Sequence, residues 1–267
     1  MSEDCLNSLY IKKFSAWAPA LETDEDWKQW ALGKRCIECS TRSPALEFTA
    51  PLFRRRLSQL SRMTIQVIHD CMPFSDNAKT IFFSYWGEIN AQFKINKMVI
   101  TENNVMPAPF SLSVFNAAPA LASIALGLRA GYTTVYPPVN VPQNVSFNTG
   151  LQTAAAALIA GGAGEVLFVY ADELFPSEYG ALAAKIVNEP FAFAVLFSDK
   201  PVSDKPEKNS VPLSKISKAS ARDFIASLYS QWGLIPRRLR RFESGLANKK
   251  MVVNPAIDKF PYRTNLV

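Results

Sequence analysis

Histidine is almost missing from this chain of 267 residues, in which His69 is the only one. Cysteine occurs four times, and all four positions lie early in the chain, at Cys5, Cys36, Cys39 and Cys71. Cys36 and Cys39 have the Cys-x-x-Cys spacing, but neither a second pair nor a nearby histidine accompanies them. Because a structural metal site needs about four such ligands, the sequence predicts no metal site.

Long hydrophobic runs are missing as well. The longest weakly charged stretch, residues 150–164, is rich in alanine and glycine and is too short to span a bilayer. The chain starts with an acidic segment, residues 1–4, which does not resemble a secretory signal. We therefore expect a cytoplasmic protein without a membrane span, whose cysteines are thiols. The formal net charge of +6 favours an acidic partner.

Apolar residues are plentiful: 48% of the chain is hydrophobic and 12% is aromatic, which is enough for a sizeable core. Residues 1–50 look irregular, with several tryptophans and prolines. Beyond them, apolar periodicity predicts strands at 80–85, 133–136, 166–170 and 191–197, and helices at 52–70, after Glu88, and at 110–126, 148–160 and 219–232. We expect a domain over residues 1–232 and a basic tail over 233–267 that contains little to form a core.

The clearest unit is the helix at 148–160 and the strand after it. Asn148 and Thr149 can cap the helix, and Gly161-Gly162 can stop it. The strand at 166–170 is apolar on both faces. A helix that leads into a strand buried on both faces indicates an α/β layered fold.

Several short segments follow one another in the order found in a known family. Phe110–Ala118 reads FSLSVFNAA, close to a family segment FSLSVHNA in which histidine often stands at the position of Phe115. Phe83–Glu88 is similar to a Ser-x-x-Gly-Glu turn, and residues 52–63 to an arginine-rich helix. Residues 127–129 and 160–173 are similar to the Gly-Leu-Arg segment and the helix-to-strand unit on either side of a nucleophile. Over roughly residues 10–230 the chain thus resembles the β-ketoacyl synthase-like N-terminal domain family.

This resemblance implies a thiolase-like α/β fold, with layered helices on a mixed five-stranded sheet, present here as a half or in truncated form. A complete synthase repeats this half. Its first half holds a cysteine nucleophile at a helix N-terminus, where the dipole and backbone N–H groups lower the thiol pKa and bind the oxyanion. Two histidines of the second half drive decarboxylation of a malonyl group. The resemblance implies no cofactor.

The sequence lacks the residues that the family uses for catalysis at the positions where they are expected. Counting forward from Gly127 with the family's spacing puts the nucleophile at Val139, and counting back from Gly162 puts it at Val145. Neither these two nor the residues between them, which include Gln143 and Asn144, carry a nucleophilic side chain. All four cysteines and the one histidine lie upstream, and the chain ends where the second half should begin. We therefore expect a non-catalytic protein.

The resemblance then implies a chain-length factor, the non-catalytic ketosynthase-like partner in type II polyketide systems, which often has glutamine at the nucleophile position. Related small domains occur with aryl polyene pathways. Such a subunit would form a heterodimer with a catalytic ketosynthase and close its acyl tunnel, in polyketide or fatty-acid-like elongation. The residues expected at the tunnel or the dimer interface are Phe83, Trp86, Phe110, Val114, Phe115, Asn116, Thr133, Val135 and Tyr136.

Arg54, Arg55, Arg56 and Arg62 form a basic group near the start of the helix predicted at 52–70. They could dock an acidic acyl carrier protein, or they could form an ordinary solvated or intramolecularly paired face. Both interpretations stay open.

Rival functions have less in their favour. A Ser-dependent acyl hydrolase could use Ser146, but a serine nucleophile needs a base and an orienting group, and neither is evident. A purely structural scaffold for a synthase also stays open. The arginines at 237–241 lack the interleaved aromatics or motif of a nucleic-acid site, so we expect no nucleic-acid partner.

Overall fold

The computed structural model describes residues 10–103, 106–137, 142–162, 164–180, 183, 188–200 and 220–231. In this part of the chain, one five-stranded sheet has the strand order β1-β5-β4-β2-β3. Its strands are β1 (Tyr10–Trp17), β2 (Lys79–Phe83), β3 (Tyr132–Val135), β4 (Glu165–Asp172) and β5 (Phe191–Ser198). β2 is parallel to β3 and β4, whereas β5 is antiparallel to both β4 and β1. The expected mixed five-stranded sheet is confirmed.

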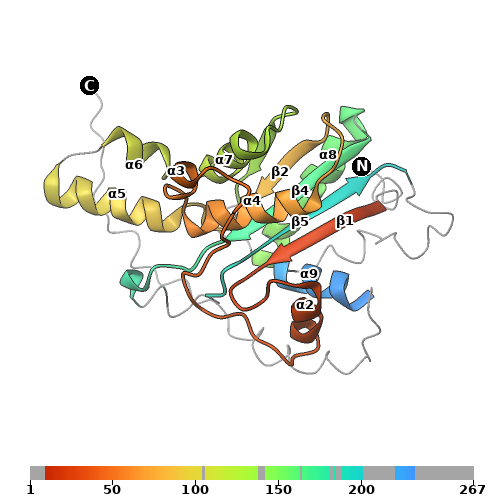
Figure 1. Cartoon of the computed structure of the whole chain (residues 1–267), viewed down its shortest axis with the longest axis horizontal. Coiled ribbons are helices and arrows are strands. Elements are labelled where there is room, and N and C mark those ends of the chain that lie inside the picture. Colours follow the sequence, from red (N-terminus) through yellow and green to blue (C-terminus); the bar gives the residue numbers. More distant parts are fainter. Residues whose placement is uncertain are drawn as a thin grey trace. The chain divides into compact units, whose positions relative to one another are not determined.

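Helices cover both faces of this sheet (Figure 1). One face packs against α4 (Gln59–Cys71) and α7 (Ala117–Leu126). The other packs against α2 (Asp24–Ala31), α8 (Gln143–Gly161) and α9 (Ala221–Gln231). Because both faces are covered, β4 and β5 are buried almost throughout, which explains their continuous apolar sequences.

The two halves of the core differ in side-chain size. On β5 the alternation places Phe191, Phe193 and Phe197 in the cluster with α8 and α9. It places Ala192 and Ala194 in the cluster with α4 and α7. The small alanine side chains let α4 and α7 lie close to the sheet, while interlocking aromatic rings fill the opposite layer.

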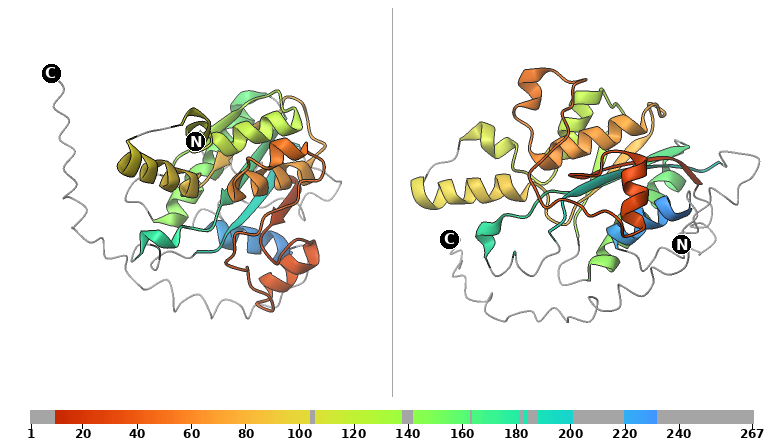
Figure 2. Two further views of the ribbon diagram at one scale, coloured as in Figure 1. Left: turned by 60° about the vertical axis from the view of Figure 1, so that its left-hand side comes forward. Right: turned by 60° about the horizontal axis from the view of Figure 1, so that its bottom comes forward.

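Three shorter or less buried α-helices, α3 (Pro51–Arg54), α5 (Ile89–Glu102) and α6 (Pro107–Ser111), and one 3-10 helix, η1 (Ser177–Tyr179), complete the helices of the described residues. α5 and α6 lie side by side, beyond one end of the sheet (Figures 1 and 2). In α5, Ile95 is the one buried residue, and Ile100 is 81% exposed. No helix of the described residues has the length and apolar character needed to cross a membrane.

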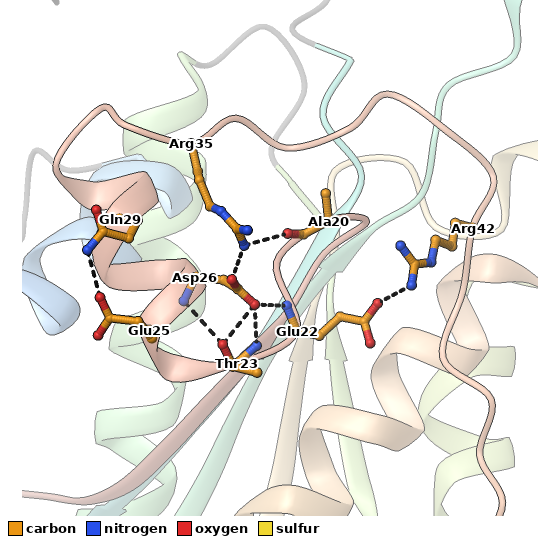
Figure 3. A network of polar contacts seen from close by, with 8 residues as sticks. All are labelled: Ala20, Glu22, Thr23, Glu25, Asp26, Gln29, Arg35 and Arg42. Carbon is orange, nitrogen blue, oxygen red and sulfur yellow. Dashed lines mark hydrogen bonds and ion pairs between the residues drawn. The ribbon is translucent and has the colours of Figure 1, made fainter.

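Residues 10–31 form a strand and a helix, so the prediction of an irregular segment is wrong there. β1 pairs with β5, and α2 follows it. α2 starts with a capping box, in which the Asp26 backbone N–H donates to Thr23 Oγ1 (3.2 Å) and the Thr23 N–H donates to Asp26 Oδ2 (3.0 Å). Arg35 then donates to Asp26, and Arg42 pairs with Glu22, so the loop after α2 is tied back to its N-terminus (Figure 3).

Helix boundaries were the other source of error. The helix predicted at 52–70 is two helices, because Ser58 starts α4 by accepting a hydrogen bond from the Ser61 N–H (2.9 Å). The helix predicted at 110–126 is likewise divided into α6 and α7. α8 begins at Gln143 rather than at 148, whereas its predicted stop is confirmed by Gly162, which has a left-handed φ of +61°. The predicted tail, residues 233–267, lies outside the described residues.

Candidate functional site

The N-terminal turn of α8 is the place to which the nucleophile count points. α8 follows Pro142 and packs on β2, β3 and β4. Val145 lies in its first turn, with 46% of its surface exposed. Val139 and the side chains of Gln143 and Asn144 lie outside the described part of the structure. Of the two counts, the one that ends at Val145 therefore reaches a described helix N-terminus, and valine has no group that could attack a carbonyl.

Neither Cys71 nor His69 is close enough to act there. Both belong to α4, which lies across the sheet from α8. The Cys71 thiol donates to the Ala194 carbonyl (3.5 Å), and burial raises its pKa to about 12, so it stays protonated. His69 stacks on Phe48 with ring centroids 3.7 Å apart, as an ordinary structural histidine would.

The remaining candidate nucleophiles are no better placed. Ser146 is next to Val145 but is only 2% exposed. Cys36 and Cys39 are exposed in the loop after α2. No group of three or more possible metal ligands occurs among the described residues.

Two aromatics proposed for the tunnel occupy different environments. Phe83 is fully buried, and its ring lies 5.1 Å from Tyr85 and 6.0 Å from Phe147. It is part of the core. Trp86 is half-buried, packs edge-on against Phe175 (5.1 Å) and lines a cavity described below.

The other predicted interface residues gather around the start of α7 and the β3 edge. The Phe115 ring lies 4.4 Å from that of Tyr136, which is 61% exposed. Position 87 favours glycine for two reasons. A Cβ there would lie 2.6 Å from Phe115 Cδ2, and the φ of +58° is in the left-handed region. Asn116 Nδ2 donates to the Tyr132 hydroxyl (3.3 Å), which ties the α7 start to β3.

Burial separates the remaining members of the predicted set. Phe110 is 53% exposed at the end of α6, and Val114 is half-buried. On β3, Thr133 is half-buried and Val135 is buried. β3 is the last strand on its side of the described sheet, so its outer edge has no strand partner there.

The four arginines do not form one surface. Arg54 Nη1 donates to the Leu46 carbonyl (3.3 Å). Arg62 donates to the carbonyls of Pro44 (3.1 Å) and Arg54 (2.6 Å), so both side chains fasten α3 and the preceding loop to α4. Arg55 and Arg56 are exposed. Only Arg55 and Arg56 are therefore consistent with a solvated basic patch.

The sequence analysis missed a buried carboxylate at the end of β4. Asp172 accepts hydrogen bonds from the Ser84 hydroxyl (2.6 Å), the Tyr170 hydroxyl (2.6 Å) and the backbone N–H groups of Tyr85 and Trp86 (3.1 Å each). Burial raises its pKa to about 6, although these donors act in the opposite direction. Asp172 thereby fixes the turn after β2 against the end of β4.

A second pair of buried carboxyl groups lies beside it. Glu88 accepts from the hydroxyls of Ser58 (2.9 Å) and Ser61 (2.6 Å), while its Oε2 is buried without a partner in the described structure. Burial and the neighbouring Glu173 raise the Glu88 pKa to about 8. Burial also raises the pKa of Glu173, which accepts from the Asn90 N–H (3.0 Å). The adjacent acids Asp172 and Glu173, directly after an apolar strand, are the signal that could have revealed this cluster.

Asp172 and Glu173 border a cavity of about 130 Å³ at the carboxyl end of β4. Its lining comes from the turn after β2, the end of β4, the start of β5 and the start of α9. The lining residues are Tyr85, Trp86, Tyr170, Asp172, Glu173, Phe175, Asn188, Glu189, Phe191, Ser220, Ala221 and Arg222.

Comparison with known protein families shows which family the chain belongs to. Residues 27–230 match the model of the β-ketoacyl synthase N-terminal domain. The chain belongs to this family. The count back from Gly162 predicts the family's nucleophile at the N-terminal turn of α8, where this chain has Val145.

Solved structures support the same fold. One similar chain comes from the ketosynthase (ApeO) in complex with its chain length factor (ApeC) of Xenorhabdus doucetiae, with a TM-score of 0.62 and 23% identity over 83% of this chain and 91% of that one. Another is the ishigamide ketosynthase/chain length factor, with a TM-score of 0.57 and 14% identity over 73% and 63% of the two chains. A third belongs to AntDE:AntF, a type II polyketide synthase acyl-carrier protein in complex with its ketosynthase bound to the hexaketide (TM-score 0.51, 15% identity, 71% and 63%).

At these identities the similarity establishes the fold, which is thiolase-like as expected. The chain spans less than two thirds of the second and third chains but 91% of the first, so it is truncated relative to the longer ones. A search of the curated proteins found no match.

Proposed function

We propose that this chain is a non-catalytic, chain-length-factor-like subunit. It pairs in the cytoplasm with a catalytic β-ketoacyl-ACP synthase and shapes the acyl tunnel of a polyketide, aryl polyene or fatty-acid-like elongation system. The observation that carries this proposal is Val145 in the first turn of α8, the position at which the count back from Gly162 expects the cysteine of a catalytic family member. Similarity to chains from ketosynthase/chain length factor complexes, one of them close to this chain in length, supports it.

The lack of a substitute nucleophile supports a non-catalytic role. Cys71 is buried and protonated, and the sheet separates it from Val145. Ser146 is buried, which also weighs against a serine hydrolase. Decarboxylation in this family needs two histidines, and the sequence contains one. The partner synthase would therefore supply both the nucleophile and the histidines.

The proposed interface is centred on the outer edge of β3. α7 and α8 flank this strand, and exposed apolar side chains occur on both helices and directly after the strand: Ile124 (71%) on α7, Val145 (46%) on α8 and Tyr136 (61%) after β3. A sheet edge bordered by apolar side chains is suited to pairing with another chain. Thr133, Val135, Phe115 and Asn116 would lie in or beside the contact.

For the tunnel wall we propose the residues that remain accessible, Phe110 and Val114. Phe83 is a core residue, and the cavity next to Trp86 has a polar floor that does not suit an acyl chain. Arg55 and Arg56 are the exposed arginines that could contact an acidic carrier protein. Arg54 and Arg62 would act indirectly, by holding the segment in place.

Co-expression with the ketosynthase encoded next to this gene, followed by sizing, tests the pairing. We expect a 1:1 complex. Ile124→Glu should reduce co-purification because it puts a charge beside the β3 edge. Leu52→Glu is the matched control, since Leu52 is equally exposed (73%) but lies on α3. A stable monomer that ignores the synthase, or equal loss with both variants, would contradict the proposed interface.

Product length tests the tunnel role separately. Each added two-carbon unit buries two methylene-sized groups, worth about 1.6 kcal/mol. Phe110→Ala in the complex should therefore shift products by about one unit towards longer chains. Because Phe110 is half exposed, this variant should still fold. Unchanged products by mass spectrometry from an intact complex would favour the scaffold role instead.

A further inference from the structure

The cavity at the carboxyl end of β4 is not used by the proposed function. Its volume of about 130 Å³ is close to that of an engineered protein cavity of about 150 Å³ that binds benzene. This is room for a small organic group, not for a growing acyl chain. The cavity lies within the layers described above, between the strand ends and the start of α9.

Aromatic rings form a large part of the wall. Five of the lining residues are aromatic: Tyr85, Trp86, Tyr170, Phe175 and Phe191. They are fixed by contacts with one another: Tyr170 lies 4.9 Å from Phe191 and 5.9 Å from Tyr85, and Trp86 lies 5.1 Å from Phe175. The Asn188 side chain fixes the backbone of Phe175 with two hydrogen bonds. It accepts one from the Phe175 N–H (2.7 Å) and donates one to the Phe175 carbonyl (3.2 Å). The wall is therefore held in place by the fold.

The floor of the cavity is acidic. Asp172 and Glu173 are 6% and 4% exposed and face the cavity from the end of β4. The buried Glu88 lies next to Glu173 and keeps one oxygen unpartnered in the described structure. Arg222 is the one cation among the described residues that line the cavity, and it is engaged with Glu189 and with the Trp30 ring (5.2 Å).

Rings and buried carboxylates favour one class of ligand. An anion would be repelled by the floor, and an aliphatic chain would lie against two buried carboxyl groups without compensating their charge. A cation gains from the faces of aromatic rings and from a nearby negative charge. We propose that this cavity binds a small organic cation, an alkylammonium group, held between the rings and above Asp172 and Glu173.

The test compares n-butylammonium with its uncharged counterpart n-butanol. Both are titrated into the full chain, and binding is measured by saturation-transfer NMR from the aromatic protons. The ammonium should bind about tenfold more tightly than the alcohol, since an interaction with a charged partner is worth about that much. Equal affinity, or no saturation transfer to the ammonium, would overturn the proposal.

Variants locate the site. Glu173→Gln keeps the side-chain shape and removes the repulsion with Glu88, so it should fold, and it should weaken n-butylammonium binding about tenfold. Trp86→Leu should weaken it about fivefold through the lost ring face. Glu178→Gln, an exposed acid outside the cavity, should leave binding unchanged. If the folded Glu173→Gln and Trp86→Leu proteins bind like the wild type, the cavity is not the site.

Discussion

A substitution at Gly150 tests how closely α8 packs against the sheet. A Cβ at this position would lie 2.9 Å from Phe83 Cδ2 and 3.1 Å from Phe168 Cε2. Gly161 ends the same helix and has no atom within 4 Å of its Cβ position. Gly150→Ala and Gly161→Ala therefore add the same methyl group to one helix, once against packed rings and once into open space.

The expected magnitudes follow from two opposing effects. Alanine stabilises a helix relative to glycine by about 0.5–1 kcal/mol, and this gain applies to both variants. An extra methyl in a packed core costs about 1–3 kcal/mol, and this loss applies to Gly150→Ala alone. For a chain of this size, about 1 kcal/mol shifts Tm by about 2–4 °C. We expect Gly150→Ala to melt about 2–12 °C below Gly161→Ala.

Thermal unfolding followed by circular dichroism, with both variants in the same assembly state, measures this difference. Catalytic assays are not needed, so the result does not depend on the proposed function. If Gly150→Ala melts at or above the temperature of Gly161→Ala, α8 does not press on Phe83 and Phe168 as described.

Three further outcomes are expected. The Glu88 pKa is about 8 in the folded chain, above its ordinary value of 4.5, so the stability it contributes at low pH is lost as pH rises between these values. Glu88→Gln should flatten this fall and be the more stable form at pH 8 in urea unfolding, and identical pH profiles would refute the assignment. Val145→Cys should give no malonyl decarboxylation by the chain alone, because the histidine pair is missing, and turnover above a heat-killed control would contradict a non-catalytic role. Thr23→Ala should lower the free energy of unfolding by about 1 kcal/mol through loss of the α2 cap, whereas an unchanged urea midpoint would argue against the capping box.

Short-range sequence patterns were enough to predict the two central strands, β4 and β5, and the end of α8. β4 and β5 were predicted because strands covered on both faces need continuous apolar sequence. The end of α8 was predicted because Gly162 adopts a left-handed conformation that glycine tolerates best. The order of short motifs also led to the correct family, since it preserves the succession of turns and helices around the sheet.

Long-range pairing explains what was missed. β1 contains polar lysines at positions 12 and 13 and a register shift there, so its alternation is broken, and its partner β5 lies far away in the chain. The division between α3 and α4 depends on one capping serine, Ser58, within an otherwise helical pattern. Neither feature leaves a strong periodic signal in a short window.

The sequence by itself determined which side chains are available. It contains one histidine and four cysteines, and folding cannot add others. Tertiary structure alone decided which groups meet. Glu88 follows β2 and Glu173 follows β4, far apart in the sequence, yet the parallel pairing of the two strands brings their ends together in a buried region. In this low-dielectric region, desolvation raises the pKa values of the buried acids beside the aromatic cavity. This effect arises only in the folded chain, because the helix and sheet layers exclude water there.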